Sequence, residues 1–229
     1  VSINASSMTD NNLLTTSGAG SVTVTGLGAN INNSASGTVN VTLANNADGL
    51  YTVTSSTAIT VANGTAQDND TITLEGAGNK TVTGLAADLS LGATNVGTTN
   101  VSSVAGNALT ITADAAAGSL TVDAASLAQN TALTLAGGGN SKTATVNNLV
   151  GNIVATSLNS VLSVDLADAG DNGISITTGT YNTTIADSAS GDTITVAAGA
   201  MADNTTLTTS GAGSFTITGL SADLANTAT

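Results

Sequence analysis

The chain has 229 residues, and 15 acidic residues against 2 basic ones give it a formal net charge of −13. It contains no Cys, Pro, Trp or His, and only one Phe and two Tyr. This composition excludes a disulfide framework, a thiol nucleophile and a His-based catalytic site. The scarcity of bases argues against binding to nucleic acid or to anionic membranes. Since no run of 18 apolar residues exists, we also expect no membrane insertion.

A short alternating segment around Ile3 is followed by a unit at residues 10–31 that recurs along the chain. The unit returns at 68–89 and 203–224, and a more divergent copy begins at Gln129. In the last copy, Leu207, Phe215 and Ile217 are separated by Thr, which predicts short strands with one buried face. Ser-Gly-Ala-Gly between the two strands predicts a turn, since Gly adopts positive φ without a steric penalty.

Further short strands are expected between these units, and almost no helix. No segment longer than about ten residues has a 3.6-residue period. The strands are predicted at 38–43, 50–54, 58–61, 107–112, 119–122, 161–166, 173–177, 180–185 and 193–196. The side chains expected to face inward, with the intervening Thr outward, are Leu207, Phe215, Ile217, Val22, Val24, Ile72, Val82 and Leu85.

The repeat spacing favours one type of all-β fold. Equivalent positions at Ile3, Val61, Val122 and Val196 give spacings of 58, 61 and 74 residues. An array of immunoglobulin-like sandwiches would need units of about 100 residues and usually a buried aromatic. A right-handed parallel β-solenoid (β-helix) with coils of about 20 residues fits better, with about three coils per ~60-residue repeat and four in the longest. Small inward residues are expected to stack on their own kind, and Asn and Thr can form ladders along the axis.

A repeat pattern that runs to both ends predicts one continuous segment over 1–229, cut from a longer chain. Its predicted repeats are 3–60, 61–121, 122–195 and a partial one at 196–229.

Calcium is the one cofactor that the sequence suggests. Asp165, Asp168 and Asp171 crowd one predicted turn, and Asp68 and Asp70 lie two residues apart in another. Carboxylates and turn carbonyls are oxygen ligands of the kind that Ca²⁺ takes. The alternative explanation is that Asp occupies turns because its side chain bonds to the nearby backbone.

Catalysis is not expected. The only two bases, Lys80 and Lys142, each lie beside a Gly-rich turn and are predicted to be solvated. A carbohydrate-cleaving β-helix would need paired carboxylates, often with basic residues in the groove.

Taken together, the repeats, the acidity and the lack of Cys resemble the β-strand-repeat surface proteins of Gram-negative bacteria. These are very long adhesins and surface-layer proteins, many of them exported by a type I system. Many also carry a calcium nonapeptide, of which this chain has only the fragments Gly137-Gly138-Gly139-Asn140 and Gly191-Asp192-Thr193-Ile194. The resemblance implies a secreted protein at the cell surface that forms an extracellular fibre or coat.

The expected function is therefore a structural module of a cell-surface filament, coat or adhesin stalk. Each end of a solenoid exposes unpaired backbone groups, so the expected partner is another copy of the chain. The alternative is recognition of a surface glycan or, in a narrower case, of ice by outward Thr in T-x-T pairs. Pairs such as Thr23/Thr25 and Thr216/Thr218 recur once per repeat rather than once per coil, so such an array is expected to have gaps.

Overall fold

The structure is a computed structural model that describes residues 1–46, 49–67, 69–168 and 172–229. It contains 23 β-strands, and the described residues form no helix, so none of them forms a helix that could cross a membrane. Odd-numbered strands make up a 12-stranded sheet and even-numbered strands an 11-stranded sheet. Every paired neighbour in both sheets is parallel.

Both sheets consist of short strands that follow one another along the chain. The 12-stranded sheet contains β1 (Ser2–Asn4), β3 (Val22–Leu27), β5 (Val39–Leu43), β7 (Ile59–Ala62), β9 (Lys80–Thr83), β11 (Thr99–Val101), β13 (Leu120–Asp123), β15 (Thr143–Leu149), β17 (Val161–Leu166), β19 (Thr183–Asp187), β21 (Thr206–Gly211) and β23 (Asp223–Ala228). The 11-stranded sheet contains β2 (Leu13–Thr16), β4 (Asn30–Asn33), β6 (Leu50–Ser55), β8 (Thr71–Glu75), β10 (Asp88–Leu91), β12 (Leu109–Ala113), β14 (Ala132–Gly137), β16 (Asn152–Val154), β18 (Asn172–Thr177), β20 (Thr193–Ala197) and β22 (Ser214–Thr218).

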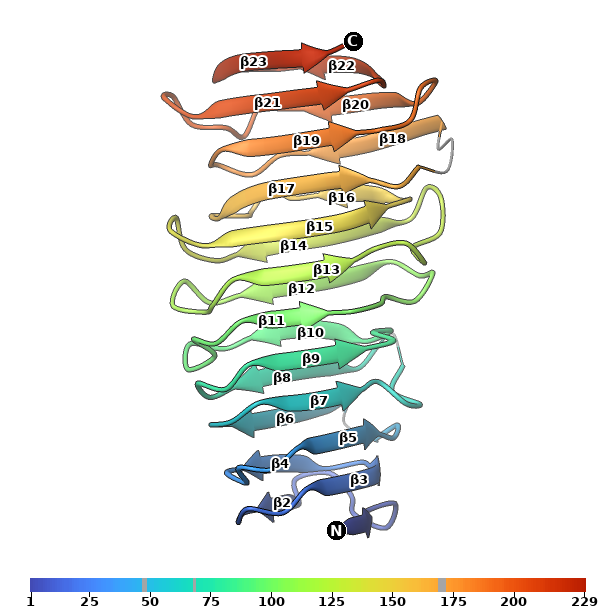
Figure 1. The fold of residues 1–229 in the computed structure, drawn as a ribbon, viewed down its shortest axis with the longest axis vertical. Coiled ribbons are helices and arrows are strands. Elements are labelled where there is room, and N and C mark those ends of the chain that lie inside the picture. The colour runs from blue at the N-terminus through green and yellow to red at the C-terminus, as the bar shows by residue number, and fades with distance from the viewer. Residues whose placement is uncertain (47–48, 68, 169–171) are drawn as a thin grey trace.

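The two sheets are the two long sides of a β-solenoid of about ten turns, with about 21 residues per turn. In Figure 1 the odd-numbered strands run from left to right in front, the even-numbered strands return behind them, and the chain climbs from N to C. This winding is right-handed. The predicted right-handed parallel solenoid is therefore confirmed, and the sandwich alternative is wrong.

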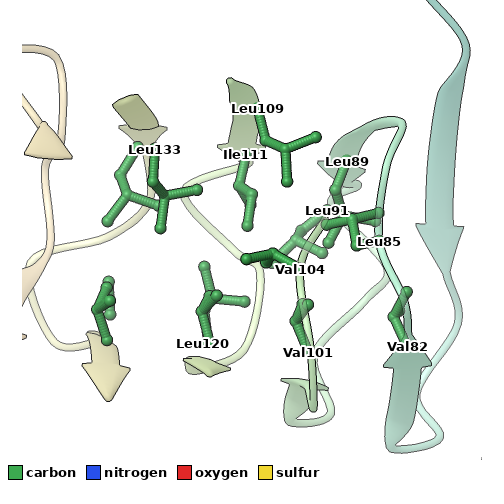
Figure 2. Packing of buried hydrophobic residues seen from close by; sticks show 14 of the residues in the cluster. Val82, Leu85, Leu89, Leu91, Val101, Val104, Leu109, Ile111, Leu120 and Leu133 are labelled. Carbon is green, nitrogen blue, oxygen red and sulfur yellow. The ribbon is translucent and has the colours of Figure 1, made fainter. Parts of the chain in front are cut away.

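The core lies between the sheets and is built by alternation of inward and outward side chains along most strands. Figure 2 shows inward side chains of successive coils, such as Val82, Val101 and Leu120 of one sheet and Ile111 and Leu133 of the other. The residues predicted to face inward and found buried are Val22, Val24, Ile72, Val82, Leu85 and Leu207. Phe215 and Ile217 also face inward, but they are only partly buried because β22 belongs to the last coil.

A left-handed backbone conformation at the same position in each unit explains why Gly or Asn occurs there. The Gly of Thr-Gly-Leu has a φ of 66° at Gly26, 64° at Gly84 and 66° at Gly219. In the divergent copy, Asn148 takes this position with a φ of 54°. Asn is one of the few residues that tolerate the left-handed region, so this substitution preserves the turn.

The longest repeat spacing corrects the expected number of coils. Ile3, Val61 and Val122 lie on β1, β7 and β13, so each of the first two spacings covers six strands, or three coils. Val196 lies on β20, seven strands after β13. The 74-residue spacing thus contains three and a half coils rather than four, and the last copy of the unit begins on the opposite sheet.

Candidate functional site

The predicted calcium ligands divide among several places in the fold. Asp68 and Asp171 lie outside the described residues. Asp70 is buried, and its Oδ2 accepts a hydrogen bond from the Gln67 N–H at 2.7 Å, so it closes its own turn as the alternative explanation proposed. Asp165 and Asp168 are exposed near the end of β17. Within the described ranges, no three acidic side chains form a group that could hold a metal ion.

Asp187, which is not among the predicted ligands, is a buried carboxylate next to this region. It ends β19, faces the interior and is 2% exposed. Its Oδ1 accepts a hydrogen bond from the Ala189 N–H at 3.1 Å, whereas its Oδ2 is buried without a hydrogen-bond partner among the described residues. Burial raises the pKa of the Asp187 carboxyl, the Ala189 N–H lowers it, and the negative charges of Asp168 and Asp165 raise it further.

A second inward carboxylate stands on the other side of the same turn. Asp192 immediately precedes β20 and is 1% exposed. The Ser188 hydroxyl, within the turn, donates to Oδ1 of Asp168 on the preceding coil at 3.3 Å. Four acidic residues therefore lie at this edge of two successive coils, two of them buried and two exposed.

The prediction that Lys80 is solvated is wrong. Its side chain faces the interior and is 1% exposed. The Lys80 ammonium donates hydrogen bonds to the backbone carbonyls of Gly76, of Gly78 at 2.7 Å and of Ser55 at 3.3 Å. Burial lowers the pKa of Lys80 from 10.5 to about 8, although the negative charge of Glu75 acts in the opposite direction. The turn carbonyls thus replace water around the charge of Lys80.

A ladder of polar side chains lies inside the solenoid where β2, β4 and β6 end, as expected for stacked Asn and Thr. The Thr16 hydroxyl donates to Oδ1 of Asn33 at 2.7 Å. Nδ2 of Asn33 donates to the hydroxyls of Ser55 at 2.9 Å and Thr57 at 3.0 Å on the next coil. The Ala35 N–H also donates to Oδ1 of Asn33, at 3.0 Å. This buried amide therefore bonds through both its oxygen and its nitrogen.

The outer face of the 12-stranded sheet carries a column of polar side chains, one per strand. Strand register aligns Ser2, Thr23, Asn40, Thr60, Thr81, Asn100, Thr121, Thr145, Ser163, Thr184 and Thr208, and Ala225 ends the column. Adjacent strands are about 4.8 Å apart. A second column is interrupted by a bulge after Val24 and by Ala62 and Ala186. The expected gaps therefore occur in the second column, whereas the first has none before its final Ala.

An open groove of about 270 Å³ crosses this face where β5, β7 and β9 begin. It is lined by Ser36, Gly37, Thr38, Val39, Thr57, Ala58, Ile59, Thr60, Asn79 and Thr81. Its hydroxyl and amide groups can exchange hydrogen bonds with a neutral polar ligand. No lining residue is acidic or basic, so the groove offers no general acid or base.

Comparisons with known proteins do not assign the chain to a family. No family model matches it, and no curated protein or solved structure matches it either. Its function must therefore be inferred from the residues and geometry described above.

Proposed function

We propose that the chain is a structural, self-associating module of an extracellular filament, coat or adhesin stalk at a cell surface. One observation carries this proposal. In the last coil, Asn226 accepts the same two kinds of hydrogen bond as Asn33, one from a Thr hydroxyl and one from the N–H two residues later. The Thr209 hydroxyl donates to Oδ1 of Asn226 at 2.7 Å, and the Ala228 N–H donates to the same oxygen at 3.1 Å. β23 is the last strand of its sheet, so Nδ2 of Asn226 holds the position from which Asn33 donates to a further coil.

The terminal coils support association in a second way. Inward residues of the last coil are incompletely covered: Leu224 is 48% exposed, and Phe215 and Ile217 are partly buried. At the other end, Ile3 and Leu14 are also only partly buried. The outer edges of these strands carry backbone groups that can pair with a further strand. A further coil, from the same chain or from a second copy, would cover this apolar surface and lengthen the solenoid.

The proposed module performs no chemistry. The ammonium of Lys80 is bonded to turn carbonyls, and the groove on the outer face has no titratable lining residue. A net charge of −13 and a surface of hydroxyl and amide groups suit a protein that stays hydrated outside a cell. Secretion and a cell-surface location belong to the proposal through the resemblance described above.

Charge placed on the inner face of the last coil tests association directly. Leu224→Lys puts an ammonium where the next coil would pack, whereas Ala225→Lys puts the same charge on the adjacent outward position. We expect the unmodified chain to form filaments or sheets by electron microscopy and larger species by sedimentation as its concentration rises. Leu224→Lys should remain monomeric, and Ala225→Lys should associate. A monomer at every concentration, or equal association of the two variants, would overturn the proposal.

The uninterrupted polar column and the groove support a second candidate, recognition of a surface glycan. Thr60 belongs to both features. If a glycan binds there, Thr60→Val should weaken binding on a glycan array, and Thr112→Val on the outer face of the other sheet should not. Binding that survives Thr60→Val would remove the groove from the proposal. Shaping of ice crystals by the unmodified chain would instead identify the polar column as an ice-binding face.

A further inference from the structure

The turn between β19 and β20 brings two carboxylates into the interior from opposite sides. Along β19, Thr183, Ile185 and Asp187 face inward, and along the next strand Asp192, Ile194 and Val196 do so. Only Ser188–Gly191 separate the two acidic residues in the sequence. The alternation that buries the isoleucines thus buries both carboxylates.

Glycines of the next coil leave room for these side chains. Asp187 is in register with Gly211, and Thr193 pairs with Ser214, so Gly213 lies over Asp192. The Ser214 N–H donates to the carbonyl of Asp192 at 2.9 Å. A Cβ built on Gly213 would lie 2.0 Å from Oδ2 of Asp187. Oδ2 of Asp187 therefore lies next to Gly213, the residue of the following coil that is stacked on Asp192.

The electrostatic environment of this space is negative. Oδ2 of Asp187 is buried without a hydrogen-bond partner in the described part of the chain, and an unpaired buried carboxylate is costly. Asp165 and Asp168 add negative charge from the exposed side. The two bases of the chain lie elsewhere, Lys80 in β9 and Lys142 just before β15. No side chain of the protein therefore brings a positive charge to Asp187.

We propose that this turn binds a divalent cation, with calcium as the probe, through the carboxylates of Asp187 and Asp192. Two carboxylates supply up to four oxygens, and water entering past the exposed turn completes the shell. Calcium suits an irregular set of oxygens better than magnesium, which demands near-ideal octahedral geometry. Asp168 lies at the mouth of the site and raises the local concentration of cations. Both ligands flank one turn, so the site ties the end of β19 to the start of β20, and it does not depend on whether the solenoid associates.

Thermal unfolding of the full chain tests the site, with and without calcium. A ligand that binds only the folded state raises the unfolding midpoint. We expect calcium at millimolar concentration to raise the midpoint of the unmodified chain by several degrees relative to a chelator, and magnesium to do less. Asp187→Asn should lose most of this shift. Asp114→Asn is the matched control, because Asp114 also accepts from the N–H two residues on, at 2.9 Å, but is exposed.

Direct binding keeps the test decisive if a variant folds poorly. Equilibrium dialysis of the unmodified chain against calcium should show one saturable site, and Asp192→Asn should weaken it at least tenfold. The proposal is wrong if the unmodified chain neither binds calcium nor shifts its midpoint. It is equally wrong if Asp187→Asn retains the full shift or if Asp114→Asn loses it.

Discussion

Two turns with almost the same sequence, 33–37 and 187–191, treat a buried polar side chain in opposite ways. The first is Asn-Ser-Ala-Ser-Gly and the second Asp-Ser-Ala-Ser-Gly. In both, Oδ1 of the first residue accepts from the N–H of the Ala two residues later. Asn33 then uses its nitrogen to bond two hydroxyls of the next coil, whereas Oδ2 of Asp187 is buried without a partner among the described residues. The next coil also differs, because it presents the hydroxyls of Ser55 and Thr57 to Asn33 but Gly211 and Gly213 to Asp187.

The largest effect should come from converting the first turn into the second. Asn33→Asp removes two hydrogen-bond donors and places a carboxylate oxygen beside the hydroxyls of Ser55 and Thr57, which already donate to backbone carbonyls. We expect the free energy of unfolding in denaturant to fall by about 3 kcal/mol, because the new charge is buried and its second oxygen has no donor. Asn32→Asp makes the same chemical change on the exposed face of β4 and should have little effect. Equal losses in the two variants would mean that the ladder does not stabilise the fold.

A pH titration examines the charged end of the same ladder, where Lys80 bonds the carbonyl of Ser55. The pKa of Lys80 is about 8 in the folded chain against an ordinary value of 10.5. Between these values the unfolded chain binds more protons, so the free energy of unfolding should rise with pH from about 8 to about 10.5. The full gain is up to about 3 kcal/mol. Measured against the unmodified chain, Lys80→Met should lack this rise, and a parallel pH profile would contradict the lowered pKa.

A smaller effect is expected from converting the second turn into the first. With a chelator present, Asp187→Asn should raise the free energy of unfolding by about 1 kcal/mol, because it removes a buried charge. Asp114→Asn should stay within about 0.5 kcal/mol of the unmodified chain, since that side chain is exposed. Denaturant unfolding of the three proteins in parallel makes the measurement. A loss of stability in Asp187→Asn without any cation would contradict the buried, unpaired oxygen of Asp187.

Much of the fold could be predicted from the sequence because alternation and repetition carry it. Alternation of Thr with Phe215 and Ile217 predicted which side chains face inward and which face outward. The spacing of about 60 residues predicted a solenoid of about three coils per repeat. The half coil in the longest spacing could not be predicted. A unit of strand, turn and strand has the same local sequence whichever sheet it begins on, because both sheets bury one face in the same way.

The candidate site was harder to predict, although part of the signal was present. Asp165 and Asp168 were selected because acidic residues crowd their turn, but crowding does not say which face a side chain occupies. Alternation with Ile185 places Asp187 inside, and alternation with Val82 places Lys80 inside. Lys80 was predicted to be exposed to solvent because its side chain is charged. In the structure, backbone carbonyls accept the hydrogen bonds of the Lys80 ammonium in place of water. The positions of these carbonyls depend on how the coils stack, which cannot be predicted from the local sequence.

The seven-strand step before the last copy of the unit has a consequence for the two sides of the solenoid. Steps of six strands return a repeat to the same side, as between β1, β7 and β13. A step of seven turns the repeat over to the opposite side. Equivalent residues of different repeats then lie on opposite sides of the solenoid within one chain. The length of a single spacer thus decides whether the repeats of one chain present the same residues on one side of the solenoid or on both sides.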